Sequence, residues 1–180
     1  MSFRISYSKA IEAILWMAGK QPGIDIYHVA KILFYADKMH LNKYGRLILG
    51  DTYVKMDYGP VPSGVLDLLR KNGYMLGPDH VDMANAAFDV DNDGHPSVNP
   101  LRQPDLDYFS KSDIECLEAS FNENAHLTFQ QLVEATHAER CYNMTPDRGL
   151  INQRLMLDEE LEDYESSCAE FEELSAYVLV

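Results

Sequence analysis

The stretch from Val29 to Leu69 carries the densest structural signals in the chain and reads VAKILFYADKMHLNKYGRLILGDTYVKMDYGPVPSGVLDLL. Its first part has the pattern of a buried helix, its middle that of a tight hairpin, and its end that of a proline-set turn leading into a second helix. No polar linker separates the three parts. We therefore expect the stretch to fold as one unit, around which the rest of the chain is organised.

The helix of this stretch should begin after Asp25, a suitable N-cap, and run to about Tyr44. Gly45 should end it, because glycine readily adopts the left-handed conformation found just after helices. At about 100° per residue, one face of the helix is apolar and should belong to the core. That face holds Ile26, Val29, Ala30, Leu33, Ala36, Leu41 and Tyr44, whereas Lys31, Lys38 and Asn42 lie opposite.

Two polar residues, Asp37 and His40, lie within this apolar face. They are one turn apart, so their side chains can contact each other. One interpretation is an acid–base pair or half of a metal site; the other is a buried pair whose members satisfy each other's hydrogen bonds. We favour the second, because catalysis needs a third group and a pocket.

After Gly45 the apolar period changes to that of strands. Residues 47–49 and 52–56 are short β-favouring runs joined by Gly50-Asp51, which suits a two-residue hairpin turn. Alternation along the second strand predicts that Tyr53 and Lys55 point the same way, with Val54 and Met56 turned to the core. A hairpin should therefore follow the helix directly.

A proline-rich turn comes next. Pro60 restricts Gly59 to non-helical conformations, and Pro62 suits the first turn of a helix that Gly73 should end. Further along, Ser112 with Glu115, and Thr128 with Gln131, predict capping boxes for two short helices.

Residues 77–104 are the least ordered part by sequence, with strands expected at residues 88–90 and around Val98. The run from Asp89 to Gly94 has the opening of a calcium-binding loop, but Pro100 stands where the bidentate Glu is required. We interpret the run as a turn.

Composition limits the architecture. With 180 residues, 46% of them hydrophobic, the chain can bury one substantial core. The predicted fold is mainly α, a single compact helical domain with a small β-hairpin or sheet element. We expect residues 1–150 to form the domain and residues 151–180 an acidic C-terminal helical extension packed on it. Residues 158–173 are rich in acids and contain no Lys or Arg, yet apolar residues recur there at helical spacing.

Charge and motifs exclude several classes of function. The formal charge of -14 argues against direct DNA binding, because affinity for phosphates comes mostly from Lys and Arg. Three widely spaced cysteines suggest neither disulfides nor a zinc ribbon. No run approaches the roughly 18 apolar residues of a membrane helix, so we expect a cytoplasmic protein. We expect no cofactor, no metal and no catalytic site, since nucleotide-binding and hydrolase motifs are missing from the sequence.

Many positions of the central stretch match one family pattern in order: Tyr35-Ala36-Asp37-Lys38, His40-Leu41, Lys43-Tyr44-Gly45-Arg46, Gly50-Asp51, Tyr53-Val54, Met56 and Tyr58-Gly59-Pro60-Val61-Pro62-Ser63. The chain thereby resembles the Panacea, or SocA-like antitoxin, domain family, and more weakly so to about residue 145. Where that family tends to have Ser-His followed by Trp, this chain has Thr136-His137 followed by Tyr142.

The resemblance implies a mainly helical fold and the role of an antitoxin that neutralises its cognate toxin by direct protein–protein binding. We expect a basic toxin encoded by the adjacent gene. One alternative is a proteolytic adaptor that delivers a toxin to a AAA+ protease, as a similar family member does. Another is an uncharacterised hydrolase or metal protein that uses Asp37, His40 and His137.

The matched positions divide into scaffold and surface. We expect the following residues to maintain the fold as a structural signature: Asp37, His40, Tyr44, Gly45, Gly50, Asp51, Gly59, Pro60, Pro62 and His137. The resemblance places His137 at the end of the second short helix, where we expect it to hydrogen-bond within the fold. For contact with a partner we select Tyr53, Lys55, Asp57 and Tyr58, because aromatic and charged side chains are typical interface anchors.

Overall fold

The computed structural model describes residues 5–91 and 94–158, and within them the protein is mainly α-helical. In chain order the described elements are α1 (Tyr7–Lys20), α2 (Ile26–Tyr44), β1 (Tyr53–Met56), β2 (Gly59–Pro62), α3 (Ser63–Leu69), α4 (Gly73–Leu76), α5 (Pro78–Ala87), β3 (Phe88–Asp91), β4 (Ser97–Pro100), the 3-10 helix η1 (Leu106–Tyr108), α6 (Lys111–Asn124), α7 (Phe129–His137), α8 (Arg140–Asn143) and the 3-10 helix η2 (Gln153–Met156). The strands form two antiparallel pairs, β1 with β2 and β3 with β4. The predicted fold class, compact and mainly α with a small β element, is confirmed.

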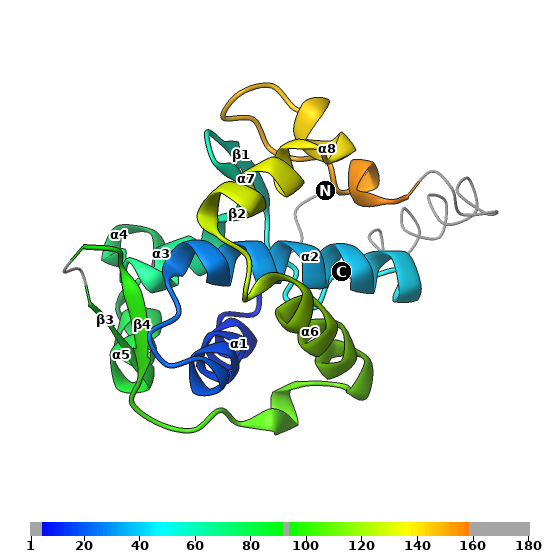
Figure 1. Cartoon of the computed structure of the whole chain (residues 1–180). Helices are drawn as coiled ribbons and strands as arrows, with labels where there is room; N and C mark the ends of the chain where they lie inside the picture. The colour runs from blue at the N-terminus through cyan, green and yellow to red at the C-terminus, as the bar shows by residue number, and fades with distance from the viewer. Residues whose placement is uncertain (1–4, 92–93, 159–180) are drawn as a thin grey trace, which may run out of the picture.

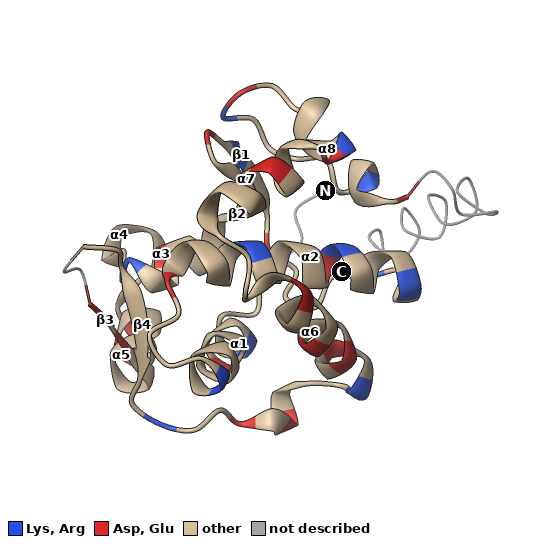
Figure 2. Ribbon diagram, viewed as in Figure 1, with Lys and Arg blue, Asp and Glu red and all other residues tan. Residues whose placement is uncertain are grey.

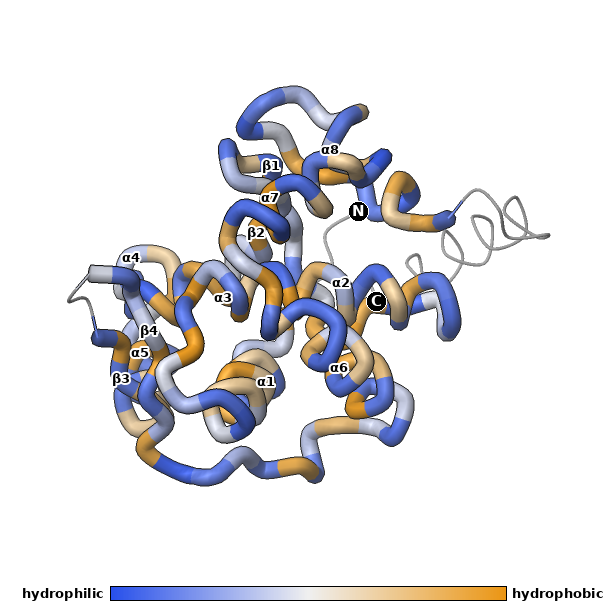
Figure 3. The backbone as a smooth tube through the Cα atoms, in the orientation of Figure 1, coloured by the Kyte–Doolittle hydropathy of each residue, from blue (hydrophilic) through white to orange (hydrophobic). Residues whose placement is uncertain are grey.

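Helix α2 runs through the middle of the molecule, with other elements on both sides of it (Figure 1). On one side lie α1, α3, α5, α6 and the β3–β4 hairpin; on the other lie the β1–β2 hairpin, α7 and α8. The larger hydrophobic cluster fills the first side, and a smaller one, which includes Phe34, Tyr53 and Met156, fills the second. Hydrophobic residues accordingly follow the facing parts of α1, α2 and α6 (Figure 3). A helix packed on both sides must be buried nearly all round.

The bounds of α2 agree with the prediction. The Asp25 carboxylate accepts a hydrogen bond of 2.8 Å from the backbone N–H of His28, as an N-cap does. At the other end Gly45 has φ of 71° and its N–H donates to the carbonyl of Leu41. The assignment of Lys31 to the face opposite the core does not make it exposed, because its side chain is fully buried. It is covered because β2 and α7 pack against the side of α2 opposite the main core.

The predicted position of the first hairpin is wrong. Residues 47–49 form no strand, and β1 pairs instead with β2, so that Lys55 lies opposite Pro60 and the turn is Asp57-Tyr58. Gly50-Asp51 makes no hairpin turn. The Asp51 carboxylate instead accepts hydrogen bonds from the backbone N–H groups of Gly64 and Val65, in the first turn of α3.

Helix α3 is shorter than expected. It begins after Pro62, which occupies the N-cap position, and ends at Leu69. Gly73 therefore does not close this helix but begins α4. The positive φ of Lys71, 50°, marks the change of direction between the two helices.

The second hairpin agrees with the prediction. Strand β3 pairs with β4 around the turn that contains Gly94. Helix α5, which precedes β3, was not expected. Backbone hydrogen bonds attach the hairpin to the rest of the fold: the N–H of Val98 donates to the carbonyl of Ile24 at 2.8 Å, and that of Ile26 to the carbonyl of Pro96 at 2.9 Å.

Helices α6 and α7 begin with capping boxes. Thr128 and Gln131 form the predicted one at α7. At α6 the box is made by Ser110 and Asp113, two residues before the predicted pair, so that prediction is wrong in position.

Beyond α8 the chain returns to β1. The N–H of Ile151 donates to the carbonyl of Tyr53, and the N–H of Lys55 donates to that of Gly149. Met156 and Leu157 then enter the smaller hydrophobic cluster. The acidic helix predicted for residues 158–173 lies, apart from its first residue, outside the described part of the chain. In that described part, no helix is both long and apolar enough to cross a membrane.

Candidate functional site

Asp37 and His40 are buried, as predicted, but they do not bond to each other. The Asp37 carboxylate accepts hydrogen bonds from the N–H of Ile48 at 2.6 Å and from the hydroxyl of Tyr53 at 2.8 Å. Burial raises the pKa of Asp37 to about 6, and these two hydrogen bonds limit the rise. Asp37 therefore connects α2 to β1 and to the segment before it.

His40, one turn further along α2, makes a separate set of bonds. Its Nδ1–H donates to the carbonyl of Arg46 at 2.8 Å, and its Nε2 lies 3.1 Å from Ser112 Oγ and 3.2 Å from Asp113 Oδ1. Asp113 also accepts from Lys9 Nζ at 2.6 Å and from the Arg46 guanidinium at 2.9 Å. Burial alone would raise the pKa of Asp113, but hydrogen bonds from His40, Lys9 and the N–H of Ser110 hold it well below its usual range. His40 thus links α2 to the start of α6.

The interpretation as a hydrolase or metal protein requires Asp37, His40 and His137 to converge. Each instead has its own partner: Asp37 binds Tyr53, His40 lies beside Asp113, and His137 stacks on Tyr142. Residues 5–91 and 94–158 contain no group of three or more acidic, His or Cys side chains arranged to hold a metal ion. No acid–base constellation is formed by the predicted residues.

The orientation predicted for β1 is inverted. Tyr53 and Lys55 do share a side, but that side faces inward: Tyr53 is fully buried, whereas Met56 is 40% exposed. The Lys55 side chain is 15% exposed; its Nζ donates to the carbonyl of Thr145 and lies 3.1 Å from Asp147 Oδ1. Tyr53 packs against α2, where its ring contacts Phe34 and its hydroxyl donates to Asp37, and the segment after α8 covers Lys55. Of the four residues selected for partner contact, only Asp57 and Tyr58 are well exposed.

Side chains of α2 hold the β1–β2 turn by its backbone. The Tyr27 hydroxyl donates to the carbonyl of Tyr58 at 3.0 Å, and one turn further along the helix Lys31 Nζ donates to the carbonyl of Pro60 at 2.7 Å. From α8, the Tyr142 hydroxyl donates to the carbonyl of Met56 at 3.1 Å. Three alternate carbonyls of the hairpin are therefore bound by side chains.

Lys31 is the most unusual of these groups. Its side chain is fully buried, and its Nζ lies 4.8 Å from the ring centroid of Tyr27. Because burial disfavours the charged form, the pKa of Lys31 is lowered to about 7. Sequence reasoning missed Lys31 as a site residue. The signal was its position within the most apolar run of the helix, residues 29–36.

Gly59 fits closely over this lysine. Its φ is +104°, and a Cβ built on it would meet Thr136 Oγ1 and lie 2.9 Å from Lys31 Nζ. Both the backbone conformation and the close approach require glycine here. Its place in the predicted structural signature has this physical reason.

An aromatic surface lies beside the turn. The Tyr58 and Phe129 rings are 5.3 Å apart in an edge contact, and Phe129 lies 4.5 Å from the ring of Tyr27. Tyr58 is 60% exposed and Phe129 46%. We name Tyr27, Tyr58 and Phe129 the aromatic platform. Sequence reasoning found only Tyr58, because nothing local connects α7 with the hairpin.

His137 stands at the end of α7, as expected, but its role differs from the prediction. Its ring stacks on that of Tyr142, with centroids 4.3 Å apart and an interplanar angle of 14°. Among the residues the structure describes, its buried Nε2 has no hydrogen-bond partner. The ammonium of Lys55 lies 4.6 Å from the same tyrosine ring. His137 therefore contributes through ring packing.

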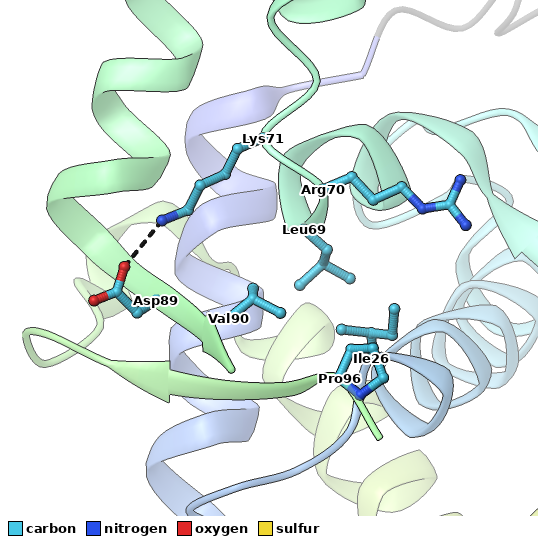
Figure 4. Close-up of a pocket in the computed structure, with 7 residues that line it drawn as sticks. All are labelled: Ile26, Leu69, Arg70, Lys71, Asp89, Val90 and Pro96. Atoms are coloured by element: carbon cyan, nitrogen blue, oxygen red, sulfur yellow. Dashed lines mark hydrogen bonds and ion pairs between the residues drawn. The ribbon is translucent and has the colours of Figure 1, made fainter. Parts of the chain in front are cut away.

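A cavity of about 310 Å³ lies on the far side of α2, between the end of α3 and the second hairpin (Figure 4). Its lining residues are Ile26, Leu69, Arg70, Lys71, Asp89, Val90 and Pro96. Lys71 and Asp89 form an ion pair of 3.1 Å, and Arg70 extends away from that pair (Figure 4). None of the site residues predicted from sequence lines this cavity.

Comparison with known proteins gives one result. A family model described as antitoxin SocA-like, Panacea domain, matches residues 29–142, which is more than half of the chain. This range contains α2 from Val29 onward, both hairpins, the aromatic residues Tyr58 and Phe129, and the helices from α3 to α7. Searches of curated proteins and of solved structures find no match.

Proposed function

The chain belongs to the family of SocA-like antitoxins with a Panacea domain, and on this basis we propose that it is the antitoxin of a toxin–antitoxin pair that neutralises its toxin by direct binding. The observation that carries the proposal is the family match over residues 29–142, which includes the whole central stretch. The site geometry supports it, because the family positions hold a hairpin whose turn residues Asp57 and Tyr58 are exposed.

The charge of the chain indicates the kind of partner. The formal net charge is -14, and acidic residues are found at the β1–β2 turn and along α6 (Figure 2). Opposite charge on a partner speeds association and disfavours wrong partners. We therefore propose a basic toxin, encoded by the adjacent gene and neutralised in the cytoplasm.

The experiment is co-expression of the full-length chain with the product of the adjacent gene. We expect the gene product alone to arrest growth, co-expression to restore growth, and the two proteins to co-purify as a complex. Failure of both rescue and co-purification would contradict the proposal.

The same experiment separates direct neutralisation from delivery to a protease. The half-life of the toxin is measured with and without this chain, in cells that contain or lack the AAA+ protease. Direct neutralisation predicts growth rescue at an unchanged toxin half-life. Rescue that requires both the protease and a shortened half-life would favour the adaptor.

A further inference from the structure

We propose that Tyr58 and Phe129 are the centre of the toxin-binding surface, and that they receive an arginine or lysine side chain of the toxin next to Asp57. This inference rests on the proposed function and deepens it. It assigns a contact to Phe129 and removes Tyr53 and Lys55 from the interface. Four observations carry it: exposure, bracing of the backbone, local charge and a comparison with other exposed aromatic residues.

The first observation is the exposure of the two rings. A pair of aromatic rings in edge contact is normally buried, because each ring carries a large apolar area. Tyr58 and Phe129 make this contact and are still 60% and 46% exposed. Exposed aromatic groups that are already packed against each other are typical centres of protein interfaces.

The second observation is that the backbone under Tyr58 is held in place before any partner arrives. Tyr27 binds the carbonyl of Tyr58 itself, and Lys31 binds that of Pro60, two residues later. Phe129 is the first residue of α7, directly after the N-cap Thr128 and within the capping box that Thr128 forms with Gln131. A surface ordered in advance loses less conformational entropy on binding, so more of the contact energy contributes to affinity.

The third observation is the charge around the rings. Asp57 adjoins Tyr58 in the turn, is exposed, and has no hydrogen bond or ion pair with any described residue. The neighbouring lysines already have partners: the buried Lys31 donates to the carbonyl of Pro60, and Lys55 forms an ion pair with Asp147. A carboxylate without a partner, next in the chain to an exposed aromatic residue, offers a guanidinium or ammonium group a counter-charge and a π face.

Other exposed aromatic residues lack this combination. Tyr74, on the four-residue helix α4, is 96% exposed, but the structure gives it no ring contact with another aromatic residue in the described part. It therefore provides a matched control: a tyrosine of greater exposure without a partner ring or a braced backbone.

The test measures the affinity of the full-length chain for the product of the adjacent gene by calorimetry, with growth rescue as a second readout. We expect Tyr58→Leu and Phe129→Leu each to weaken binding about 10-fold or more, since both lose a π face while keeping an apolar side chain. Tyr58→Phe should stay within about 3-fold of wild type, because the Tyr58 hydroxyl has no bond within the described residues. Tyr74→Leu should bind as wild type does.

Charge variants test the cationic part of the proposal. Asp57→Asn should weaken binding and Asp57→Lys should weaken it more, and the loss should shrink as salt is raised. Asp57 is exposed, so these variants are expected to fold even if a ring variant does not. If Asp57→Lys binds as tightly as wild type, a cationic side chain is not what the surface receives.

The outcomes separate this inference from the proposed function. If the wild-type chain neither binds nor rescues, the proposed function fails. If wild type binds and rescues while Tyr58→Leu and Phe129→Leu do so equally well, the function stands and this surface is overturned. If those two variants keep wild-type affinity but melt at lower temperature, another part of this chain covers the rings, and the inference is again wrong.

Discussion

The two hairpins of the protein have strands of the same length and are attached to the fold in different ways. The β1–β2 pair is held by side chains in addition to its backbone hydrogen bonds to residues 149–151: Tyr27, Lys31 and Tyr142 bind its carbonyls, and Asp37 binds the hydroxyl of Tyr53. The β3–β4 pair is joined mainly through backbone hydrogen bonds to the segment between α1 and α2. The attachment of β1–β2 therefore depends on particular side chains far more than the attachment of β3–β4 does.

This difference predicts which of the two hairpins tolerates substitution. A backbone hydrogen bond is available to almost any residue, whereas a bond from a buried lysine or aspartate needs that side chain in that place. Apart from the fully buried Phe88 and Val98, substitutions should therefore be costly around β1–β2 and mild around β3–β4. The following variants test the comparison, from the largest expected effect to the smallest.

Gly59→Ala should have the largest effect. Its Cβ would collide with Thr136 and lie 2.9 Å from Lys31 Nζ, in a residue whose φ is +104°. Strain and overpacking together should cost about 3–5 kcal/mol of unfolding free energy. Chemical denaturation measures it.

The other hairpin provides the control. Gly94 has a similar φ of +92°, but a Cβ there would meet nothing within 4 Å. Gly94→Ala should therefore show the conformational cost alone, about 1–2 kcal/mol. Equal losses for the two variants would mean that close packing under the first hairpin does not matter.

Asp37→Leu should cost about 3 kcal/mol, because it leaves the N–H of Ile48 without its acceptor and the hydroxyl of Tyr53 with only the longer bond to the carbonyl of Leu33. Asp37→Asn keeps an oxygen for Ile48 and should be much milder. On the second hairpin, Asp89→Ala removes only an ion pair with Lys71 at the surface and should cost at most about 1 kcal/mol. Thermal and denaturant unfolding measure the loss of stability in the three variants. A larger loss for Asp89→Ala than for Asp37→Leu would contradict the comparison.

Lys31→Met should change how stability depends on pH. The pKa of Lys31 is about 7 in the folded protein and near 10.5 when unfolded, so between these values the unfolded state binds more protons. Wild-type stability should therefore rise with pH in this window, by up to about 1 kcal/mol per pH unit relative to the variant, and the difference should be constant below pH 7. A difference that does not change from pH 7 to pH 10 would show that Lys31 titrates normally.

Tyr27→Phe should have the smallest effect. It removes one hydrogen bond to the carbonyl of Tyr58 at a partly exposed position and should cost about 1 kcal/mol or less. Combined with Lys31→Met, the cost should be non-additive, because both side chains hold the same turn. Strict additivity in a double-mutant cycle would mean that the two bonds act independently.

The same contrast explains which parts of the fold are predictable from sequence. The strands of β3–β4 and the bounds of α2 follow from local signals: a turn composition around Gly94, a cap at Asp25 and a glycine at position 45. Strand β2 has two prolines among four residues, and no local pattern marks it as the partner of β1. The pair is held by Lys31, which binds the carbonyl of Pro60, and by Tyr142, which binds that of Met56, and both are distant in sequence.

The candidate site is predictable only in part, for a related reason. Asp57 and Tyr58, which were selected for partner contact, are exposed turn residues. The inward side of β1 is the one that packs against α2, where Tyr53 contacts Phe34 and Asp37, and local sequence does not show this packing. Lys31 was assigned to the polar face because periodicity cannot reveal that a helix is covered on both sides. Phe129 requires the packing of α7 beside the hairpin, which local sequence does not show.

The edges of the first hairpin have one more consequence. The outer edge of β1 is already paired with residues 149–151, and β2 contributes Pro60 and Pro62, which have no N–H to donate. Neither edge can therefore accept a further strand, whether from a partner or from a second copy of the chain. The hairpin is protected against edge-to-edge aggregation, and any protein that recognises it must do so through side chains.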